Sequence, residues 1–541
     1  MKKLFTKLLS AMLAMTIIVT GVTSLAGCKV KNDPNTIYVS IINKGYGTEW
    51  ANTLMDKFLK SDAKYANYKY EIIPNKNDEA TKTTVESGEK HCNYDLVFHG
   101  GESDLISSEY LVDLTPVYEM AYKDGKLKDY MDQNVVSSFE RTDGAGNTYY
   151  NSIPYVSAGS GLIVNYELVT AKLGANWEQN YPCRTTEEFM VFLKALRDAN
   201  VIPFVMVTNR NFYGALYETW WAQFEGMNGV KDFYSARYYN ELEERYEESY
   251  EAFLQPGILQ SLKVMEDIFQ NEANYKNPVY TDWSAMQAAF MEGFSAMIVN
   301  GSWMYNEMTN KLNYKGIDMR FIKTPVISAL GYELGLSTGS KASGSELADV
   351  NYTITDESKF IEVIDYVDGK TTTKPAGVSD AVIDRVREAR SIVWGTVDNA
   401  NTSIPSYSIK KDVALDFVKW MYSEEGHKEY VLATQGLFLP VENDILANNP
   451  SIQLNSFTKT FNDFVTGSTL LFPNRQWKYS KSSLVLVAAS KKSPAIEYLI
   501  TGKSGLKENG VELNTAYRIY EYNRTFYGNA TNWNQLQNEV R

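Results

Sequence analysis

The sequence predicts an α/β fold arranged as two or more domains. Strands and amphipathic helices alternate along the chain from residue 36, and the same alternation resumes after Pro154. Strand–helix–strand order of this kind implies parallel strands joined by helical crossovers. The chain is also long: its 541 residues exceed the roughly 250–300 at which a single hydrophobic core stops growing. With 44% hydrophobic residues, it has enough apolar material for large cores.

The N-terminus has the layout of a secretory signal. Three lysines within the first seven residues precede the uncharged apolar stretch Leu8–Val22, and small residues follow up to Leu25-Ala26-Gly27-Cys28. An uncleaved membrane anchor is the alternative, because the apolar stretch is nearly long enough to span a bilayer. Leu-Ala-Gly-Cys resembles the bacterial lipobox, whose cysteine receives diacylglycerol before cleavage in front of it. We therefore expect residues 1–27 to be a lipoprotein signal peptide, and Cys28 to carry a lipid on the extracytoplasmic face of the bacterial cell membrane.

Charge and cysteine content restrict the partners of the mature chain. The formal net charge is -13, and removing residues 1–27, with three lysines and no acids, would lower it to -16. Nucleic acid and anionic lipid both need a basic surface, so neither is expected as the main partner. Cys92 and Cys183 are the only other cysteines. A disulfide between them and two free thiols remain equally open.

The elements of the first 100 residues follow from their residue patterns. Residues 36–42 are expected as a strand because Ile, Tyr and Val dominate there. A glycine-containing turn leads into a helix on which Trp50, Leu54 and Phe58 recur every four residues. Further strands are expected at 68–73 and 94–99.

The same alternation continues beyond Pro154. Thr185-Thr186-Glu187-Glu188 is a capping box that starts a helix with an apolar face. The acidic, tyrosine-rich run 237–251 is expected to be a solvated helix face. The remaining expected elements are strands at 161–166, 202–207 and 296–299, helices at 283–291 and 411–422, and a helix starting near Trp303.

One motif runs from Ala288-Ala289-Phe290 through Gly293 to Ala296–Trp303. It is similar to the pattern AAF..GKAAM..NGSW of the family 1 solute-binding proteins of carbohydrate ABC importers, which are maltose-binding-protein-like. It is the closest match among several segments that together resemble this family. Glu167 departs from the lysine usual after the family's GL.YN segment. The other similar segments are Gly45–Trp50, Tyr94–Phe98, Leu111–Thr115, Ile153–Tyr166, Lys323–Val326 and Ala414–Met421.

The resemblance implies a periplasmic-binding-protein-like type II fold, in which two α/β lobes hold a ligand in the cleft between them. It implies lobe 1 from residues 36–153 and 315–422, and lobe 2 from residues 154–314 and 423–541, with residues 28–35 as a tether. A monomer that closes on its ligand and delivers it to the transmembrane permease subunits is expected, with no cofactor.

Candidate ligand contacts combine aromatic platforms with fixed polar groups, as a sugar requires. Trp303 is the first choice because it opens a helix where the family places a stacking aromatic; a core position is the alternative. Of the adjacent Trp220 and Trp221, only one is expected to face the cleft, and we choose Trp221. The further candidates are Tyr46, Glu49, Gly101, Glu102, Ser157, Ser160 and Trp394. Glu49 is also consistent with a helix N-terminal charge, and Asp282 is read as a helix cap.

Other function classes find less support. An exported, lipid-anchored carbohydrate-active enzyme is the main alternative, but the sequence has no Gly-x-Ser-x-Gly and no phosphate-binding Gly-x-x-x-x-Gly-Lys-Ser/Thr motif. His91, His99 and His427 are far apart and form no helical zinc pair, so no metal site is expected. A non-sugar solute such as a peptide stays open as the ligand. We therefore expect a lipid-anchored binding protein for a sugar or oligosaccharide.

Overall fold

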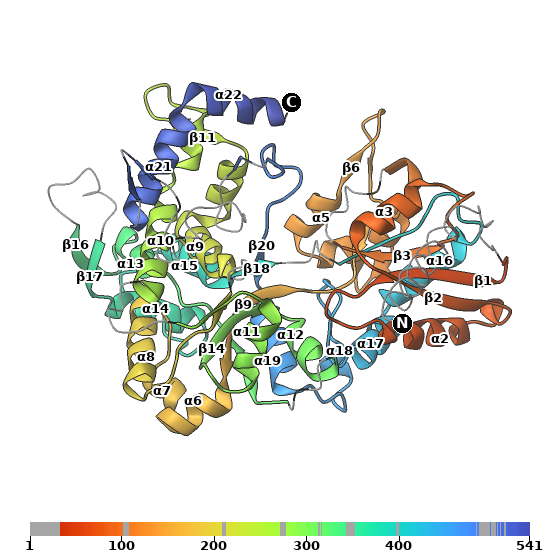
Figure 1. The fold of residues 1–541 in the computed structure, drawn as a ribbon, viewed down its shortest axis with the longest axis horizontal. Helices are drawn as coiled ribbons and strands as arrows, with labels where there is room; N and C mark the ends of the chain where they lie inside the picture. The colour runs from red at the N-terminus through yellow and green to blue at the C-terminus, as the bar shows by residue number, and fades with distance from the viewer. Residues whose placement is uncertain are drawn as a thin grey trace, which may run out of the picture.

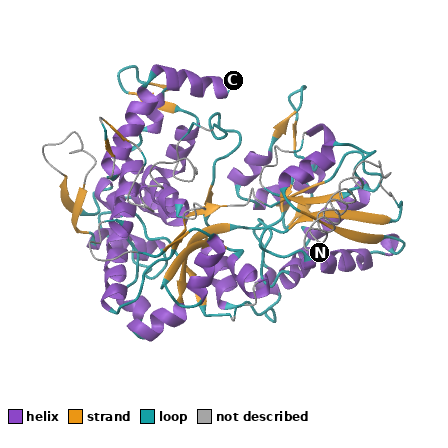
Figure 2. Cartoon of the chain, in the orientation of Figure 1, coloured by secondary structure: helices purple, strands orange, loops and turns teal. Residues whose placement is uncertain are grey.

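The computed structural model has two lobes lying side by side, joined by segments that cross between them (Figure 1). It describes residues 33–100, 106, 108–207, 213–270, 277–311, 314, 316–341, 352–395, 400–482, 484–485, 498, 505, 507–508, 510–512 and 515–540. Cys28, Gly101 and Glu102 lie outside these residues. Each lobe is built on a mixed sheet with helices on both faces (Figure 2).

The first sheet has the strand order β2-β1-β3-β19-β8. Its parallel core, β1 (Thr36–Ile42), β2 (Lys69–Asn75) and β3 (Leu96–His99), confirms the three strands predicted for the first 100 residues. β19 (Asn401–Ser403) and β8 (Ile153–Pro154) complete the sheet in antiparallel pairing.

Helices cover both faces of this sheet. On one face α2 (Glu49–Ser61) buries Trp50, Leu54 and Phe58, as its four-residue period predicts, beside α16 (Lys411–Met421). On the other face α3 (Asp78–Glu86) packs through Val85 in a separate apolar cluster. Because β1 and β3 are parallel, their carboxyl ends point to the same edge of the lobe.

The second sheet has the order β14-β9-β18-β20, with β15 also paired to β9. Its strands are β14 (Met297–Gly301), β9 (Gly159–Asn165), β18 (Ile392–Gly395), β20 (Thr469–Leu471) and β15 (Met319–Ile322). On β9, Leu162 and Val164 belong to the apolar cluster that includes α9 (Gly214–Tyr234). Gly161, with the opposite orientation, lies against Phe464 of α19 (Ser456–Val465). The two faces of the sheet are therefore an α9 side and an α19 side.

The crossings between lobes differ in part from those expected. The chain leaves the first sheet at Pro154 and enters the second at Gly159. Because β15 and β18 lie in the second sheet, the return to the first sheet falls between Gly395 and Asn401, not near residue 315. The third crossing follows α17 (Glu424–Ala433), which still packs on α2 through Tyr430 and Trp50, so it lies beyond residue 422.

Two regions complete the second lobe. The run 237–251 is not the predicted helix face: it forms an antiparallel hairpin, β11 (Arg237–Asn240) and β12 (Arg245–Glu248). Tyr239 and Tyr246 pair across the two strands with their rings 5.1 Å apart, which a hairpin permits and a helix would not. Near the C-terminus, α21 (Ala516–Gly528) and α22 (Ala530–Glu539) cover α10 (Pro256–Phe269) and its neighbours.

Local chemistry starts several helices as the sequence predicts. Thr185 caps α8 (Thr186–Asp198) by accepting a hydrogen bond from the backbone N–H of Glu188 at 3.2 Å. Asp282 caps α11 (Trp283–Met291) by accepting from the N–H groups of Ser284 and Ala285. Cys92 and Cys183 are buried as free thiols in different lobes. Among the described helices, none is long and apolar enough to cross a membrane.

Candidate functional site: a platform between the lobes

Two indoles and a serine meet at one end of the second sheet, on its α9 side. Ser160 of β9 pairs with Gly301 of β14 on one side and with Trp394 of β18 on the other. A Cβ placed on Gly301 would fall inside the indole of Trp303, so this ring lies over the glycine. Glycine at 301 is what lets Trp303 come so close to the sheet. The structure thus brings Trp303, Ser160 and Trp394 into one row, which we call the platform.

Trp394 is held in place by a buried carboxylate. Its indole Nε1 donates to Oε2 of Glu218 at 2.8 Å, and Glu218 is only 2% exposed on α9. An indole has a single donor, and this contact uses it. The ring of Trp394, and not its N–H, is therefore the part of the side chain left to contact other groups.

The hydroxyl of Ser160 lies at the centre of the platform. Ser160 is 2% exposed, and its Oγ has no hydrogen-bond partner among the described residues. A buried hydroxyl left without a partner costs about 1–3 kcal/mol. A ligand hydroxyl bound between the two indoles would recover that loss.

The loop after β1 in the first lobe touches the platform directly. Gly45, with φ +92°, packs on the Cβ of Trp303. The hydroxyl of Tyr46 lies 3.0 Å from Oγ of Ser302, and burial raises the pKa of Tyr46 above its usual value. Both hydroxyls are engaged with each other across the lobes. Tyr46 therefore fixes the loop against Trp303.

A second set of polar groups stands at the carboxyl ends of β1 and β3. Asp78, at the start of α3, accepts from the backbone N–H of Gly100 at 2.5 Å and from Nζ of Lys44 at 2.7 Å. His99 is buried between the carbonyl of Gly100 and Oγ of Ser403, each 3.0 Å from a ring nitrogen. Burial lowers the pKa of His99 to about 4, so its ring is neutral at pH 7. These fixed groups lie in the first lobe beside the loop that carries Gly45 and Tyr46.

The sequence did not single out Lys44, Asp78 and Glu218. Asp78 and Glu218 come from helices whose relation to β3 and β18 depends on the tertiary fold. Lys44 lies in the glycine turn before Tyr46, and a cation in a turn next to a candidate ligand residue was the one signal that could have indicated it.

Three predicted residues lie apart from the platform. Trp221 has 0% exposure in the second-lobe core, where its indole donates to Oε1 of Gln255 at 2.7 Å. Glu49 is exposed at the first turn of α2, and its carboxylate accepts from the N–H of Thr48 at 3.0 Å. Ser157 lies on the α19 side of the second sheet, in a groove between the lobes of about 570 Å³.

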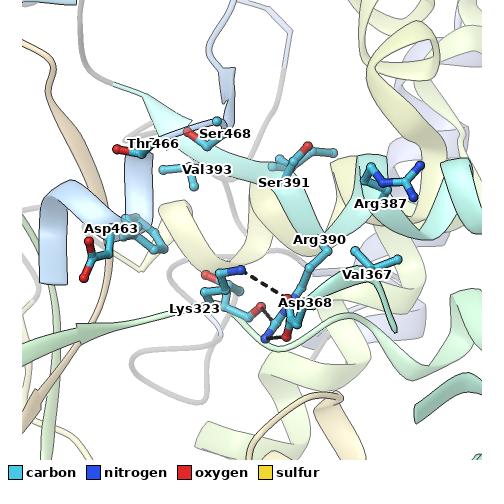
Figure 3. Close-up of a pocket in the computed structure, with 14 residues that line it drawn as sticks. Lys323, Val367, Asp368, Arg387, Arg390, Ser391, Val393, Asp463, Thr466 and Ser468 are labelled. Carbon is cyan, nitrogen blue, oxygen red and sulfur yellow. Dashed lines mark hydrogen bonds and ion pairs between the residues drawn. The ribbon is translucent and has the colours of Figure 1, made fainter. Parts of the chain in front are cut away.

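A smaller cavity in the second lobe is lined by charged residues (Figure 3). It has a volume of about 160 Å³. Arg390 and Lys323 both reach Asp368 there, with N–O distances of 2.9 and 3.1 Å. Of the described candidates, none lines this cavity. Across the described part of the chain, no three His, Cys, Asp or Glu side chains gather as a metal site.

Solved structures with the same fold include the solute-binding protein RafE in complex with raffinose, with a TM-score of 0.51 and 15% identity over 91% of this chain and 99% of that one. The binding protein MsmE of Bacillus subtilis, in an open conformation, gives a TM-score of 0.50 and 11% identity over 92% and 98%. These likenesses confirm the predicted two-lobed periplasmic-binding-protein fold.

Among curated proteins, none matches the chain. A protein family accounts for most of it, because residues 53–459 match the bacterial extracellular solute-binding proteins. Members of such a family bind a solute and do not transform it, which agrees with the expectation of a non-catalytic protein. The chain belongs to the bacterial extracellular solute-binding protein family.

Proposed function

We propose that this protein is the substrate-binding subunit of an ABC importer and captures a sugar or oligosaccharide between its lobes. The observation that carries the proposal is the platform, in which the indoles of Trp303 and Trp394 flank the hydroxyl of Ser160, which has no hydrogen-bond partner among the described residues. Sugars present C–H faces to aromatic rings and hydroxyls to fixed polar groups. The platform offers both within one row of side chains.

The first-lobe groups suit a neutral ligand. His99 is uncharged at pH 7, and the ammonium of Lys44 is neutralised by Asp78. A ligand rich in hydroxyls can exchange hydrogen bonds with such groups and does not require a charge of its own. Closure of the lobes would then bury it from both sides, and a permease that recognises the closed form would sense occupancy.

Calorimetry of the chain from residue 29 onward tests the proposal directly. Titration with a panel of mono- and oligosaccharides should give saturable heats, and chromatography should recover each sugar unchanged. Trp303→Ala should weaken binding at least about tenfold, because it removes half of the aromatic surface. Saturable binding of peptides with no response to any sugar would contradict the sugar assignment.

We further propose that Cys28 carries the lipid that holds the protein at the membrane. The support is the Leu25-Ala26-Gly27-Cys28 segment behind a charged and apolar leader. Two acyl chains on one residue give a stable anchor, whereas a single chain gives only a marginal one. Mass spectrometry of the membrane-extracted protein should find an N-terminal peptide starting at a diacylglyceryl-modified Cys28. An N-terminal peptide starting at Met1 would contradict it.

A further inference from the structure

The segment Phe472–Ser480, which we call the strap, touches both lobes within nine residues. It follows β20 at the edge of the second sheet and rises between the lobes (Figure 1). Its first half contacts α5 (Gln133–Phe139) of the first lobe, and its second half returns to the second lobe. The strap is separate from the three crossings, because the chain does not change lobes along it.

The first-lobe anchor of the strap is Asn474. This side chain is 2% exposed, and its Nδ2 donates to the carbonyl of Asn134 at 3.1 Å, to Oδ1 of the same residue at 2.8 Å and to Oγ of Ser137 at 2.8 Å. Gln476 adds a bond to the carbonyl of Glu140 at 2.6 Å. Because Asn474 is buried, the loss of its partners would leave a polar group unsatisfied, which makes this a specific contact with the opposing helix.

The second-lobe anchors begin at Trp477. Its ring stacks on Tyr234, at the end of α9, with ring centroids 5.8 Å apart. The backbone N–H of Tyr479 donates to the carbonyl of Tyr234 at 2.8 Å, and its buried hydroxyl binds Glu248 of β12. Lys478 forms an ion pair with Glu248 at 2.7 Å. Apolar burial and hydrogen bonds together hold this half of the strap.

The strap also stands at one end of the platform. In the second sheet, β20 is the neighbour of β18, so the row from Trp303 through Ser160 to Trp394 runs toward the strap. Across the cleft, the guanidinium of Arg475 lies over the ring of Phe139, 5.4 Å from its centroid. Burial is the main cause of the low pKa of His99, and the positive charge of Arg475 also contributes. The strap therefore spans the space between the His99 side and the Trp394 side.

We propose that the strap is a fourth connection between the lobes and forms the end wall of the ligand cleft on the β20 side. Its contacts with α5 limit how far the lobes can separate. A ligand lying along the platform meets the strap beyond Trp394. The end-wall part rests on the proposed function, whereas the connection between the lobes does not.

Asn474→Ala tests the connection in the protein without ligand. The chain from residue 29 onward should show amide hydrogen exchange at least about tenfold faster in α5 and in the strap, because both lose their shared hydrogen bonds. Small-angle X-ray scattering should show a larger radius of gyration than the unaltered protein. Asn532→Ala is the matched control, because its Nδ2 also donates to a backbone carbonyl, that of Phe526 at 3.0 Å, but within the C-terminal helices.

Unchanged exchange in α5 together with an unchanged scattering curve would overturn the proposal. Gln476→Ala provides a second test if Asn474→Ala fails to fold, since Gln476 is exposed and its bond to Glu140 is the outer contact. It should raise exchange in the strap and at the end of α5, and no change there would equally overturn the proposal. These measurements are made without sugar. Their outcome therefore does not depend on whether the proposed sugar ligand is correct.

Discussion

The indole nitrogen of Trp394 lies 2.8 Å from the carboxylate of Glu218, a contact that joins the strand β18 to the helix α9 in the second lobe. One partner comes from the middle of the second sheet and the other from a helix 176 residues earlier in the chain. The orientation of the proposed sugar platform therefore depends on a residue that need not touch the sugar.

Glu218→Ala should weaken sugar binding about tenfold, because the indole of Trp394 loses the acceptor of its N–H and is free to rotate. Unfolding in urea should show a loss of about 1–3 kcal/mol from the unsatisfied donor. Glu218→Gln is the control, since its amide oxygen can still accept. Equal binding by the alanine variant and the unaltered protein would show that Trp394 does not depend on Glu218.

Gly301→Ala should weaken binding through displacement of Trp303. The new Cβ would occupy the space of the indole, so the ring must leave the sheet. We expect a loss of affinity of about tenfold, comparable to removing the aromatic group itself. Gly144→Ala is a suitable control because no described atom lies within 4 Å of the Cβ it would add. Calorimetry measures the sugar affinity of both variants. Equal affinities of Gly301→Ala and Gly144→Ala would contradict the placement of Trp303.

Trp221→Ala should act on stability. The side chain is fully buried against Phe233 and Tyr234, so its removal leaves a large cavity and should cost about 3–5 kcal/mol in the free energy of unfolding. Trp303→Ala should cost less, because Trp303 is only half-buried. Urea denaturation of the two variants measures this contrast. A nearly unchanged Trp221→Ala midpoint would restore Trp221 as a candidate ligand contact.

The protein should lose stability as the pH falls below 6.5. Burial lowers the pKa of His99 to about 4 and that of His427 to about 3, from 6.5. In this window the unfolded chain binds protons that the folded one excludes, so each histidine costs about 2 kcal/mol at pH 5. Urea denaturation at pH 7 and pH 5 measures the loss.

His427→Gln should remove about half of this histidine contribution. Its amide oxygen can replace Nε2, which accepts from the N–H of Leu439 at 3.0 Å. An identical pH dependence in the variant and the unaltered protein would exclude His427 as a source.

The sequence predicted those parts of the fold whose signals are local. The strand at 36–42 and the period of Trp50, Leu54 and Phe58 depend on neighbouring residues, and they appear as expected. The return crossing near residue 315 was misplaced because membership of β15 and β18 in the second sheet is a matter of long-range pairing. The acidic run 237–251 was misread because its charges fit a solvated helix and a solvated hairpin equally well.

The candidate site was predictable to a similar extent. The sequence points to Trp303, Ser160 and Trp394 for separate reasons, and strand register shows that they are neighbours. Trp221 could not be separated from Trp220 by periodicity, since α9 buries residues all around its first half and both indoles have 0% exposure. Glu218 and Asp78 gave no signal because their roles arise from partners far along the chain.

The position of β19 has a consequence for the order of folding. This strand inserts between β3 and β8, which precede it by about 300 and 250 residues, so the first sheet has a gap until residues 401–403 arrive. Pairings over such separations close slowly, because the loop entropy is lost before the contacts form. The first sheet therefore cannot reach its native strand order during synthesis until residues 401–403 have been made. A protein that ended at residue 395 would expose the facing edges of β3 and β8 to association.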